Sequence, residues 1–314
     1  RAEDYGLACD NPRFDLAKIY ARKDRVVERL RAGIGALLKK NKVEVVTGHG
    51  RFKTPNALAV EGAEEVVADR IILATGTTPL RPSFLPMDAE TVVDSDYFLA
   101  LTQLPKSVLV IGGGYIGCEL ATVLNGLGCQ VTVAEMLPRL VPTADEDVSK
   151  ELLRAFKKLK IEVHVGVKVE SLQKQSGQAT ATLTGGKSVT AEKALVAIGR
   201  TLCTADLGLE NAGLKPTARG TLDVNEHCQT SVPHVYAIGD IAGKAQLAHV
   251  ASKMGLVAAA HATGRRARVN YSVIPACVFT QPEIGNVGLT EAEAAGSGRE
   301  VKCARFSYQA LGKA

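Results

Sequence analysis

The chain contains no tryptophan, and aromatic residues make up only 4% of its 314 positions. No apolar run is long enough to span a bilayer and no secretory signal opens the chain, so we expect no membrane function. The net charge of +5 comes from Lys and Arg scattered among Asp and Glu, which fits exposed helix faces better than a nucleic-acid groove. A composition of 46% hydrophobic and 23% charged residues is typical of a globular protein, here of two or three domains.

Paired cysteines are also missing. The seven cysteines stand at irregular spacings, without a C-x-x-C pair or a cluster at metal-ligand spacing. We therefore expect no metal site, a cytoplasmic location, and free thiols that are buried or half-buried at Cys9, Cys118, Cys129, Cys203, Cys228, Cys277 and Cys303.

The stretch from 106 to 135 has the order strand, glycine turn, helix and strand. Gly112 permits a tight turn, Gly114 lets a pyrophosphate approach the helix N-terminus, and Gly117 lets the helix pack close to the strand. Such glycines also fill turns of α/β domains that bind no nucleotide. Here the strand, the helix and a following acidic residue all stand where a dinucleotide needs them, so the pattern predicts a dinucleotide site.

The acidic residue is Glu135, which the second strand (130–134) delivers. Its carboxylate is placed to accept hydrogen bonds from both hydroxyls of an adenosine ribose. A negative charge here bonds the free 2′-hydroxyl of NAD and repels the 2′-phosphate of NADP. Arg139 is near, but the key position is acidic, so the sequence predicts NAD.

Hydrophobic periodicity outlines the other elements. A long amphipathic helix is predicted over 15–40 and an Ala-rich helix over 247–263. Thr143 and Glu146 form the pattern of a capping box at the start of another helix. A hairpin turn is predicted at Gly185-Gly186, and short strands at 43–46, 57–60, 70–73, 162–165, 167–172, 194–198 and 235–238.

Asp240 closes an apolar strand at a glycine, the position where α/β sheets bind ligands, although an Asp there is as often a helix cap. It belongs to a series of motifs in fixed order, namely Thr75-Gly76, the glycine motif, Gly199-Arg200, TSVPHVYAIGD (230–240), LAH (247–249) and FTQPEIGNVGLTE (279–291). Together they resemble the flavin-dependent pyridine nucleotide–disulfide oxidoreductases over essentially the whole chain. Among these the likeness is greatest to dihydrolipoyl dehydrogenases, with mercuric and glutathione reductases more distant.

The resemblance implies which residues hold the two cofactors, FAD and NAD. The ribityl chain of FAD would contact Asp240. The further contacts of FAD would be Gly50, Thr75, Gly76, Thr77, Gln246, Leu247, Ala248 and His249. NAD would lie on Gly112, Gly113, Gly114, Tyr115, Ile116, Gly117, Glu119, Glu135, Val169 and Gly199. Glu119 resembles the family carboxylate near the reactive nitrogen of the flavin, and Tyr115 resembles an aromatic lid. The alternative for Glu119 is a charge on the helix surface, and for Tyr115 it is an aromatic residue of the core.

The implied fold is α/β, with a Rossmann-like NAD-binding domain inserted in an incomplete FAD-binding domain and followed by the start of an α+β dimerisation domain. The expected boundaries are 1–104 for a partial FAD-binding domain and 105–225 for the NAD-binding domain. The FAD-binding domain returns over 226–268, and a shortened interface domain covers 269–314.

The implied activity passes electrons from dihydrolipoamide thiols through flavin to NAD⁺. It also needs an N-terminal glycine motif, a C-x-x-x-x-C pair and a C-terminal His–Glu pair, and the sequence contains none of these. We therefore expect a chain cut at both ends and inactive alone, which retains NAD binding and holds flavin weakly or not at all.

The complete parent would be a homodimer acting on lipoyl groups of 2-oxoacid dehydrogenase complexes or of the glycine cleavage system. The alternatives are another disulfide reductase, similar to mercuric reductase or NADH oxidase, and a non-catalytic NAD-binding fragment.

Overall fold

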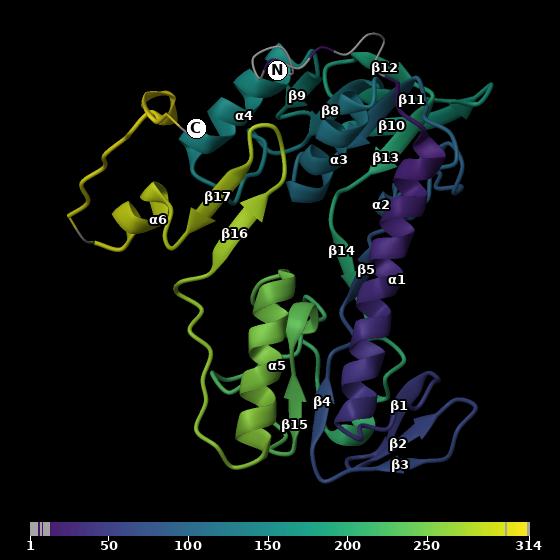
Figure 1. Ribbon diagram of the computed structural model, residues 1–314, viewed down its shortest axis with the longest axis vertical. Coiled ribbons are helices and arrows are strands. Elements are labelled where there is room, and N and C mark those ends of the chain that lie inside the picture. Colours follow the sequence, from purple (N-terminus) through teal and green to yellow (C-terminus); the bar gives the residue numbers. More distant parts are fainter. Residues whose placement is uncertain (1–5, 7, 9–12, 299, 313–314) are drawn as a thin grey trace.

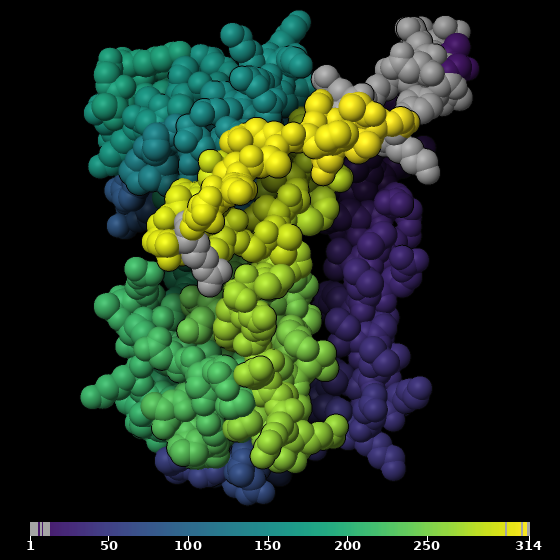
Figure 2. All heavy atoms as spheres, turned by 90° about the vertical axis from the view of Figure 1, so that its left-hand side faces the viewer, coloured from purple at the N-terminus to yellow at the C-terminus, as the bar shows by residue number. Residues whose placement is uncertain are grey.

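The computed structural model describes residues 6, 8, 13–298 and 300–312 (Figure 1). Cys9, expected as a free thiol, lies outside the described residues. In Figure 1 the upper body is built on a parallel sheet, and the lower body contains α5 (Ala248–Ala262) with several short strands beside it. The long helix α1 (Leu16–Lys40) runs beside both bodies, and Figure 2 shows the C-terminal segment, in yellow, crossing one face of the molecule.

The upper body holds the predicted dinucleotide unit in a five-stranded parallel sheet of order β6-β13-β7-β8-β9. These strands are β6 (Val92–Val93), β7 (Ser107–Ile111), β8 (Gln130–Glu135), β9 (Glu162–Val165) and β13 (Lys193–Val196). The helices α3 (Tyr115–Gly126) and α4 (Glu146–Lys158) follow β7 and β8. The predicted order of strand, glycine turn, helix and strand is therefore confirmed.

Both faces of the parallel sheet are covered, which explains why β7 is an uninterrupted apolar run. Because side chains alternate along a strand, Val108 and Val110 pack in one core cluster with residues of α3 and α4. Leu109 and Ile111 pack in a second cluster with a three-stranded antiparallel sheet. That sheet consists of β10 (Val169–Gln175), β11 (Gln178–Leu183) and β12 (Ser188–Ala191), and the predicted glycine hairpin joins its last two strands.

The lower body joins segments far apart in the sequence. Strand β4 (Ile71–Leu73) pairs in parallel with β15 (Val235–Ala237), which leads into the short helix η3 (Gly239–Ala242). A small antiparallel sheet lies beside this pair, and η2 (Leu209–Ala212) packs against it. Its strands are β1 (Gly50–Thr54), β2 (Ala57–Val60) and β3 (Val66–Val67).

A two-stranded ladder connects the two bodies. Strand β5 (Thr77–Pro79), which follows β4, pairs antiparallel with β14 (Arg200–Leu202), which follows β13. The short helix α2 (Ser95–Phe98) precedes β7. The C-terminal part consists of β16 (Pro275–Val278), β17 (Ile284–Val287), α6 (Glu291–Gly296) and η4 (Tyr308–Ala310).

Two of the predicted local features are wrong, and a third, the long N-terminal helix, forms without a buried face. No strand forms at 43–46, because these residues pair with no neighbour in the described chain, and Val45 is 65% exposed. Helix α1 forms as predicted, with Asp15 accepting a hydrogen bond from the Lys18 amide, but none of its residues is buried. The capping box at Thr143 is also wrong, since α4 begins after Asp145.

Candidate functional site

The three motif glycines have different neighbours. Gly112 has a φ of +109°, and a Cβ there would lie 2.4 Å from the Ala197 carbonyl oxygen. A Cβ on Gly117 would lie 2.0 Å from the Gly112 carbonyl oxygen, so this glycine lets α3 pack on the strand. Gly114 has an ordinary φ of −74°, and nothing within 4 Å would meet its Cβ. The fold therefore does not require glycine at 114, and the space beside it is free for a ligand.

Helix α3 begins directly at this free space. Gly114 is its N-cap and supplies no side-chain hydrogen bond to the first turn. The unpaired backbone N–H groups of that turn, together with the helix dipole, favour an anion at this position. The geometry of the loop thus suits a phosphate group.

Glu135 ends β8 and is buried, with 7% of its surface exposed. Its Oε1 accepts a hydrogen bond from the Leu137 amide at 2.7 Å, and its Oε2 accepts one from the Gly113 amide. A carboxylate has about four lone-pair sites, so two remain for a ligand. The bond to Gly113, which sequence reasoning missed, shows that Glu135 also holds the glycine loop in place.

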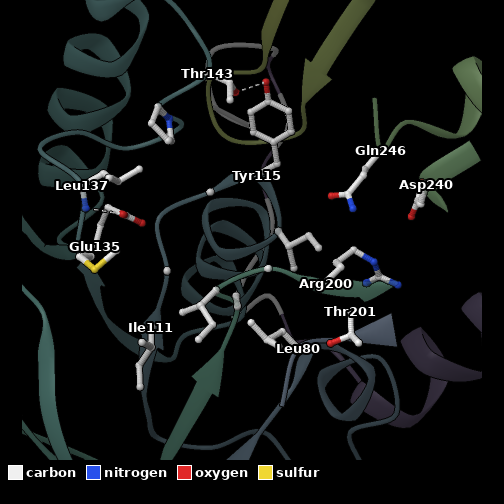
Figure 3. A pocket seen from close by; sticks show the side chains of 18 of the residues that line it. Leu80, Ile111, Tyr115, Glu135, Leu137, Thr143, Arg200, Thr201, Asp240 and Gln246 are labelled. Carbon is white, nitrogen blue, oxygen red and sulfur yellow. Dashed lines mark hydrogen bonds between the residues drawn. The ribbon is translucent and has the colours of Figure 1, made fainter. Parts of the chain in front are cut away.

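The glycine loop and Glu135 line a cavity of about 1260 Å³ that extends to η3 and the start of α5 (Figure 3). This volume exceeds the usual range for one small ligand, which is roughly 300–1,000 Å³. The predicted site residues that the fold brings together in this cavity are Gly112, Gly114, Tyr115, Ile116, Glu135, Val169, Gly199, Asp240, Gln246 and Leu247.

At the far side of the cavity Asp240 is tied to the connecting ladder. Thr77 Oγ1 donates to Asp240 Oδ2 at 2.5 Å. Arg200 Nε in turn donates to Thr77 Oγ1 at 2.6 Å, and Arg200 Nη2 donates to the Thr77 carbonyl at 2.8 Å. Because Arg200 supplies a hydrogen to the threonine oxygen, the hydroxyl hydrogen of Thr77 is left to orient the Asp240 carboxylate.

The cavity has a cationic lining that the motifs did not reveal. Arg200, Lys168, Arg219 and Lys244 all line it, against the carboxylates of Glu135 and Asp240. Cations in a confined cleft raise the local concentration of anionic ligands, so the lining favours phosphate-bearing molecules. Isolated Lys and Arg in loops carry no sequence signal, which explains why only Arg200 stood in a recognisable motif.

Other predicted residues lie outside the cavity lining. Gly113 and Gly117 lie within the glycine-loop packing, and Gly50 pairs with Val60 in the small antiparallel sheet. Thr75 and Gly76 are hydrogen-bonded to the backbone of Cys203. Ala248 begins α5.

Two predicted residues bind the C-terminal segment instead of facing the cavity. Glu119 Oε1 accepts a hydrogen bond from the Phe279 amide at 2.9 Å. His249 Nε2 donates to the Pro275 carbonyl at 2.7 Å. The role of Glu119 beside a flavin therefore stays a prediction.

Among the described residues, no group of three or more His, Cys, Asp or Glu side chains is arranged to hold a metal ion. None of the helices in that part of the chain has the length and apolar character that crossing a membrane requires. The six described cysteines are free thiols, of which Cys118, Cys129 and Cys228 are buried and Cys203 is half-buried. Cys277 and Cys303 are exposed, so the expectation that these two are buried or half-buried is wrong.

Two family profiles match the sequence. The profile described as pyridine nucleotide-disulphide oxidoreductase matches residues 5–255, and that of the dimerisation domain of the same family matches residues 274–314. A dihydrolipoyl dehydrogenase of Bacillus subtilis is 38% identical over all of this chain and 70% of its own length. The enzyme of that name from Thermus scotoductus is 41% identical, with 100% and 68% covered.

Solved structures give the same result. LpdA from Mycobacterium tuberculosis has a TM-score of 0.87 and 28% identity, over 94% of this chain and 66% of its own. The HOCl-induced flavoprotein disulfide reductase RclA from Escherichia coli has a TM-score of 0.87 and 26% identity, over 96% and 70%. The chain thus spans about two thirds of the length of its relatives. Since one family profile matches most of the chain, and relatives above 30% identity extend along all of it, this protein belongs to the pyridine nucleotide-disulphide oxidoreductase family.

Proposed function

We propose that the chain forms the electron-accepting part of a dihydrolipoyl dehydrogenase, with NAD bound at the glycine loop and FAD beside Asp240. The observation that carries the proposal is the single cavity that joins the glycine loop and Glu135 to Asp240. A nicotinamide ring at one end of the dinucleotide could then meet a flavin held at the other side. The bound cofactors would supply hydride transfer between nicotinamide and flavin.

The residues of the chain would bind and orient both groups. The open space at Gly114 and the N–H groups of α3 would take the pyrophosphate of NAD. The free lone pairs of Glu135 would accept the ribose hydroxyls. Thr77 would hold the Asp240 carboxylate ready for the ribityl hydroxyls of FAD. For the other predicted contacts, which lie outside the cavity lining, the family resemblance is the sole support.

We propose NAD as the partner in preference to NADP. The carboxylate of Glu135 is fixed by two backbone amides at the position where the 2′-substituent would lie. A fixed negative charge there repels a phosphate, and this repulsion is stronger in a partly buried site than in water. The nearby Arg139 donates to the Pro142 carbonyl at 2.8 Å and is thus engaged elsewhere.

The thiol chemistry needs groups that this sequence does not contain, since no two of its cysteines are spaced C-x-x-x-x-C. We therefore propose lipoamide turnover for a polypeptide that joins this chain to a redox-active cysteine pair and a His–Glu pair. Its partners would be lipoyl groups of 2-oxoacid dehydrogenase complexes or of the glycine cleavage system. It would act as a cytoplasmic homodimer, with the domain boundaries expected from the sequence.

Binding titrations of the purified 314-residue chain test the proposal. We expect NADH to bind at least tenfold more tightly than NADPH, because Glu135 faces the 2′-position. The Glu135→Ala variant should bind NADH more weakly, and the ratio between its affinities for NADH and NADPH should be smaller. We expect FAD, which this chain alone would hold only weakly, to be lost on gel filtration, and we expect no NADH formation from dihydrolipoamide. Equal affinity for NADH in Glu135→Ala and in the unchanged chain would contradict the assignment.

The substrate is tested separately, because other members of the family act on other acceptors. A polypeptide that contains this chain with the cysteine and His–Glu pairs would be assayed against dihydrolipoamide, Hg²⁺ and O₂. Turnover of dihydrolipoamide alone is expected. Preference for Hg²⁺ or O₂ would favour the mercuric reductase or NADH oxidase alternative, and no turnover at all would favour a non-catalytic NAD-binding module.

A further inference from the structure

A second cavity lies at the C-terminal end of α5. Its volume of about 710 Å³ falls within the usual range for a small ligand, which is roughly 300–1,000 Å³. Helix α5 follows Leu247, which lines the first cavity, and its 15 residues span about 22 Å. In Figure 1 the far end of α5 lies at the lower edge of the molecule. The second cavity is therefore separate from the proposed cofactor site.

The lining of the second cavity is cationic. Arg265, Arg266 and Arg268 contribute three guanidinium groups, and all three residues are exposed. None of the three is among the arginines that form ion pairs in the described part of the chain. Glu226 lies 3.6 Å from His227 Nε2, measured from its Oε1, but is not part of the lining. Three positive charges within four positions repel one another, and a bound anion would remove that repulsion.

Helix α5 ends without using these guanidinium groups. The Gly264 amide donates to the His261 carbonyl, and Gly264 takes the left-handed conformation with a φ of +83°. The Arg265 amide and the Thr263 hydroxyl both donate to the Ala260 carbonyl. Carbonyls at the end of the helix that an arginine side chain could satisfy are thus already bonded. The three side chains remain available for a ligand.

His261 adds a directed donor to the lining. Its Nδ1 lies 2.9 Å from the hydroxyl oxygen of Tyr236, which is buried, with 2% of its surface exposed. The tyrosine hydroxyl has no other acceptor among the described residues, so it donates to Nδ1, and the hydrogen of the neutral imidazole is on Nε2. Since no hydrogen bond within the described chain uses this Nε2–H group, it can donate to an anion in the cavity.

The loop that carries the arginines is held in place. The ring of His227 stacks on that of His261, with centroids 4.4 Å apart and an angle of 7° between the planes. His227 Nδ1 donates to the Ala267 carbonyl, because a carbonyl can only accept. The Val269 amide donates to the Glu226 carbonyl at 2.8 Å. A loop fixed in this way needs little further ordering, which reduces the entropic cost of binding a ligand.

We propose that this second cavity binds a small anion that carries two or more phosphate groups. A guanidinium group donates two parallel hydrogen bonds to phosphate oxygens, and three such groups favour a ligand with several negative charges. A nucleoside triphosphate and an inorganic polyphosphate share this chemistry. Because the cavity is separate from the glycine loop, the inference does not rest on the proposed function.

Calorimetric titration of the 314-residue chain with inorganic tripolyphosphate tests the site. A constant ionic strength of about 0.15 M screens unspecific attraction between exposed charges. Since the glycine loop also favours phosphate, variants decide which site is filled. The double variant Arg266→Gln, Arg268→Gln should bind tripolyphosphate about tenfold more weakly or worse, because it loses charge-assisted hydrogen bonds.

The matched control removes the same two charges from α1. Arg29 and Arg31 are exposed on that helix and line neither cavity. The double variant Arg29→Gln, Arg31→Gln should bind tripolyphosphate as the unchanged chain does. An equal loss in both double variants, or no loss in the first, would overturn the inference.

Protection from phenylglyoxal, which modifies arginine, locates the ligand without any variant. We expect tripolyphosphate to slow modification at Arg265, Arg266 and Arg268, measured by peptide mapping, and to leave the rate at Arg31 unchanged. This readout does not depend on whether the chain binds NAD, so failure of the proposed function leaves it intact. Equal rates at the three arginines with and without tripolyphosphate would overturn the inference.

A comparison of three anions identifies the ligand. ATP and tripolyphosphate carry the same triphosphate group, so stronger protection by ATP indicates a nucleotide, and equal or stronger protection by tripolyphosphate indicates inorganic polyphosphate. Citrate carries three carboxylates and no phosphate, and we expect it to protect the arginines less. Protection by citrate equal to that by tripolyphosphate at the same concentration would overturn the assignment to phosphate.

Discussion

The glycine loop allows a matched test in which one methyl group is added at two positions three residues apart. At Gly117 the new Cβ would lie 2.0 Å from the carbonyl oxygen and 3.1 Å from the carbonyl carbon of Gly112, both backbone atoms. Backbone atoms cannot rotate away, so α3 must move off the strand. Overpacking of this kind costs about 3 kcal/mol of unfolding free energy or more.

Gly114→Ala should behave in the opposite way. Its φ of −74° suits alanine, and no atom lies within 4 Å of the new Cβ. Alanine is a poorer N-cap than glycine by about 0.5 kcal/mol, which the lower entropy of the unfolded chain offsets. The change in stability should therefore stay within about 0.5 kcal/mol. The methyl group would keep a phosphate from the N–H groups of α3. Losing these hydrogen bonds should cost about 2–3 kcal/mol of binding free energy, which corresponds to about 30- to 150-fold weaker NADH binding.

Denaturant unfolding measures the stability term, and titration followed by NADH fluorescence measures the binding term. Gly126→Ala, at the other end of α3 with nothing within 4 Å, is the control and should alter neither quantity unfavourably. Normal NADH affinity in Gly114→Ala, or normal stability in Gly117→Ala, would refute the division of roles.

Three further outcomes are expected. Burial raises the pKa of Asp88, but hydrogen bonds from the Val92 amide, a lysine and two further amides outweigh it and lower the pKa to about 2. The contribution of Asp88 to stability is thus complete above the unfolded pKa of 3.8 and is lost as pH falls towards 2. In Asp88→Asn the free energy of unfolding should therefore fall less steeply with pH on the acid side. An unchanged slope would contradict this. Burial and the nearby Glu135 raise the pKa of Cys118 to about 12, so iodoacetamide should modify exposed Cys277 in the native protein and reach Cys118 only after unfolding, as peptide mapping would show. Glu135→Gln should lower the unfolding free energy by about 2 kcal/mol in denaturant titrations, because one of the two backbone amides loses its acceptor.

Local patterns in the sequence were sufficient for the elements whose shape depends on near neighbours. The apolar run before Gly112 and the glycine spacing predicted the strand, turn and helix, because these residues interact over a few positions. The 15–40 pattern predicted α1 for the same reason. Its burial could not be predicted, since a periodic face shows only that the helix can pack, and the described chain supplies no partner for most of it. The segment 43–46 has strand-forming residues but no neighbouring strand to pair with.

The contacts that complete the site were decided by tertiary structure. The ladder between β5 and β14 brings Thr77 to Arg200, and the pairing of β4 with β15 brings it to Asp240, across 123 and 163 positions of sequence. The bond between Thr143 and Tyr115 likewise depends on how the loop after β8 folds over α3, and the local pattern pointed instead to a helix cap. The sequence alone determined which residues could bind a dinucleotide. Which of them share one cavity was set by strand pairing, because contacts between distant segments leave no periodic trace in the chain.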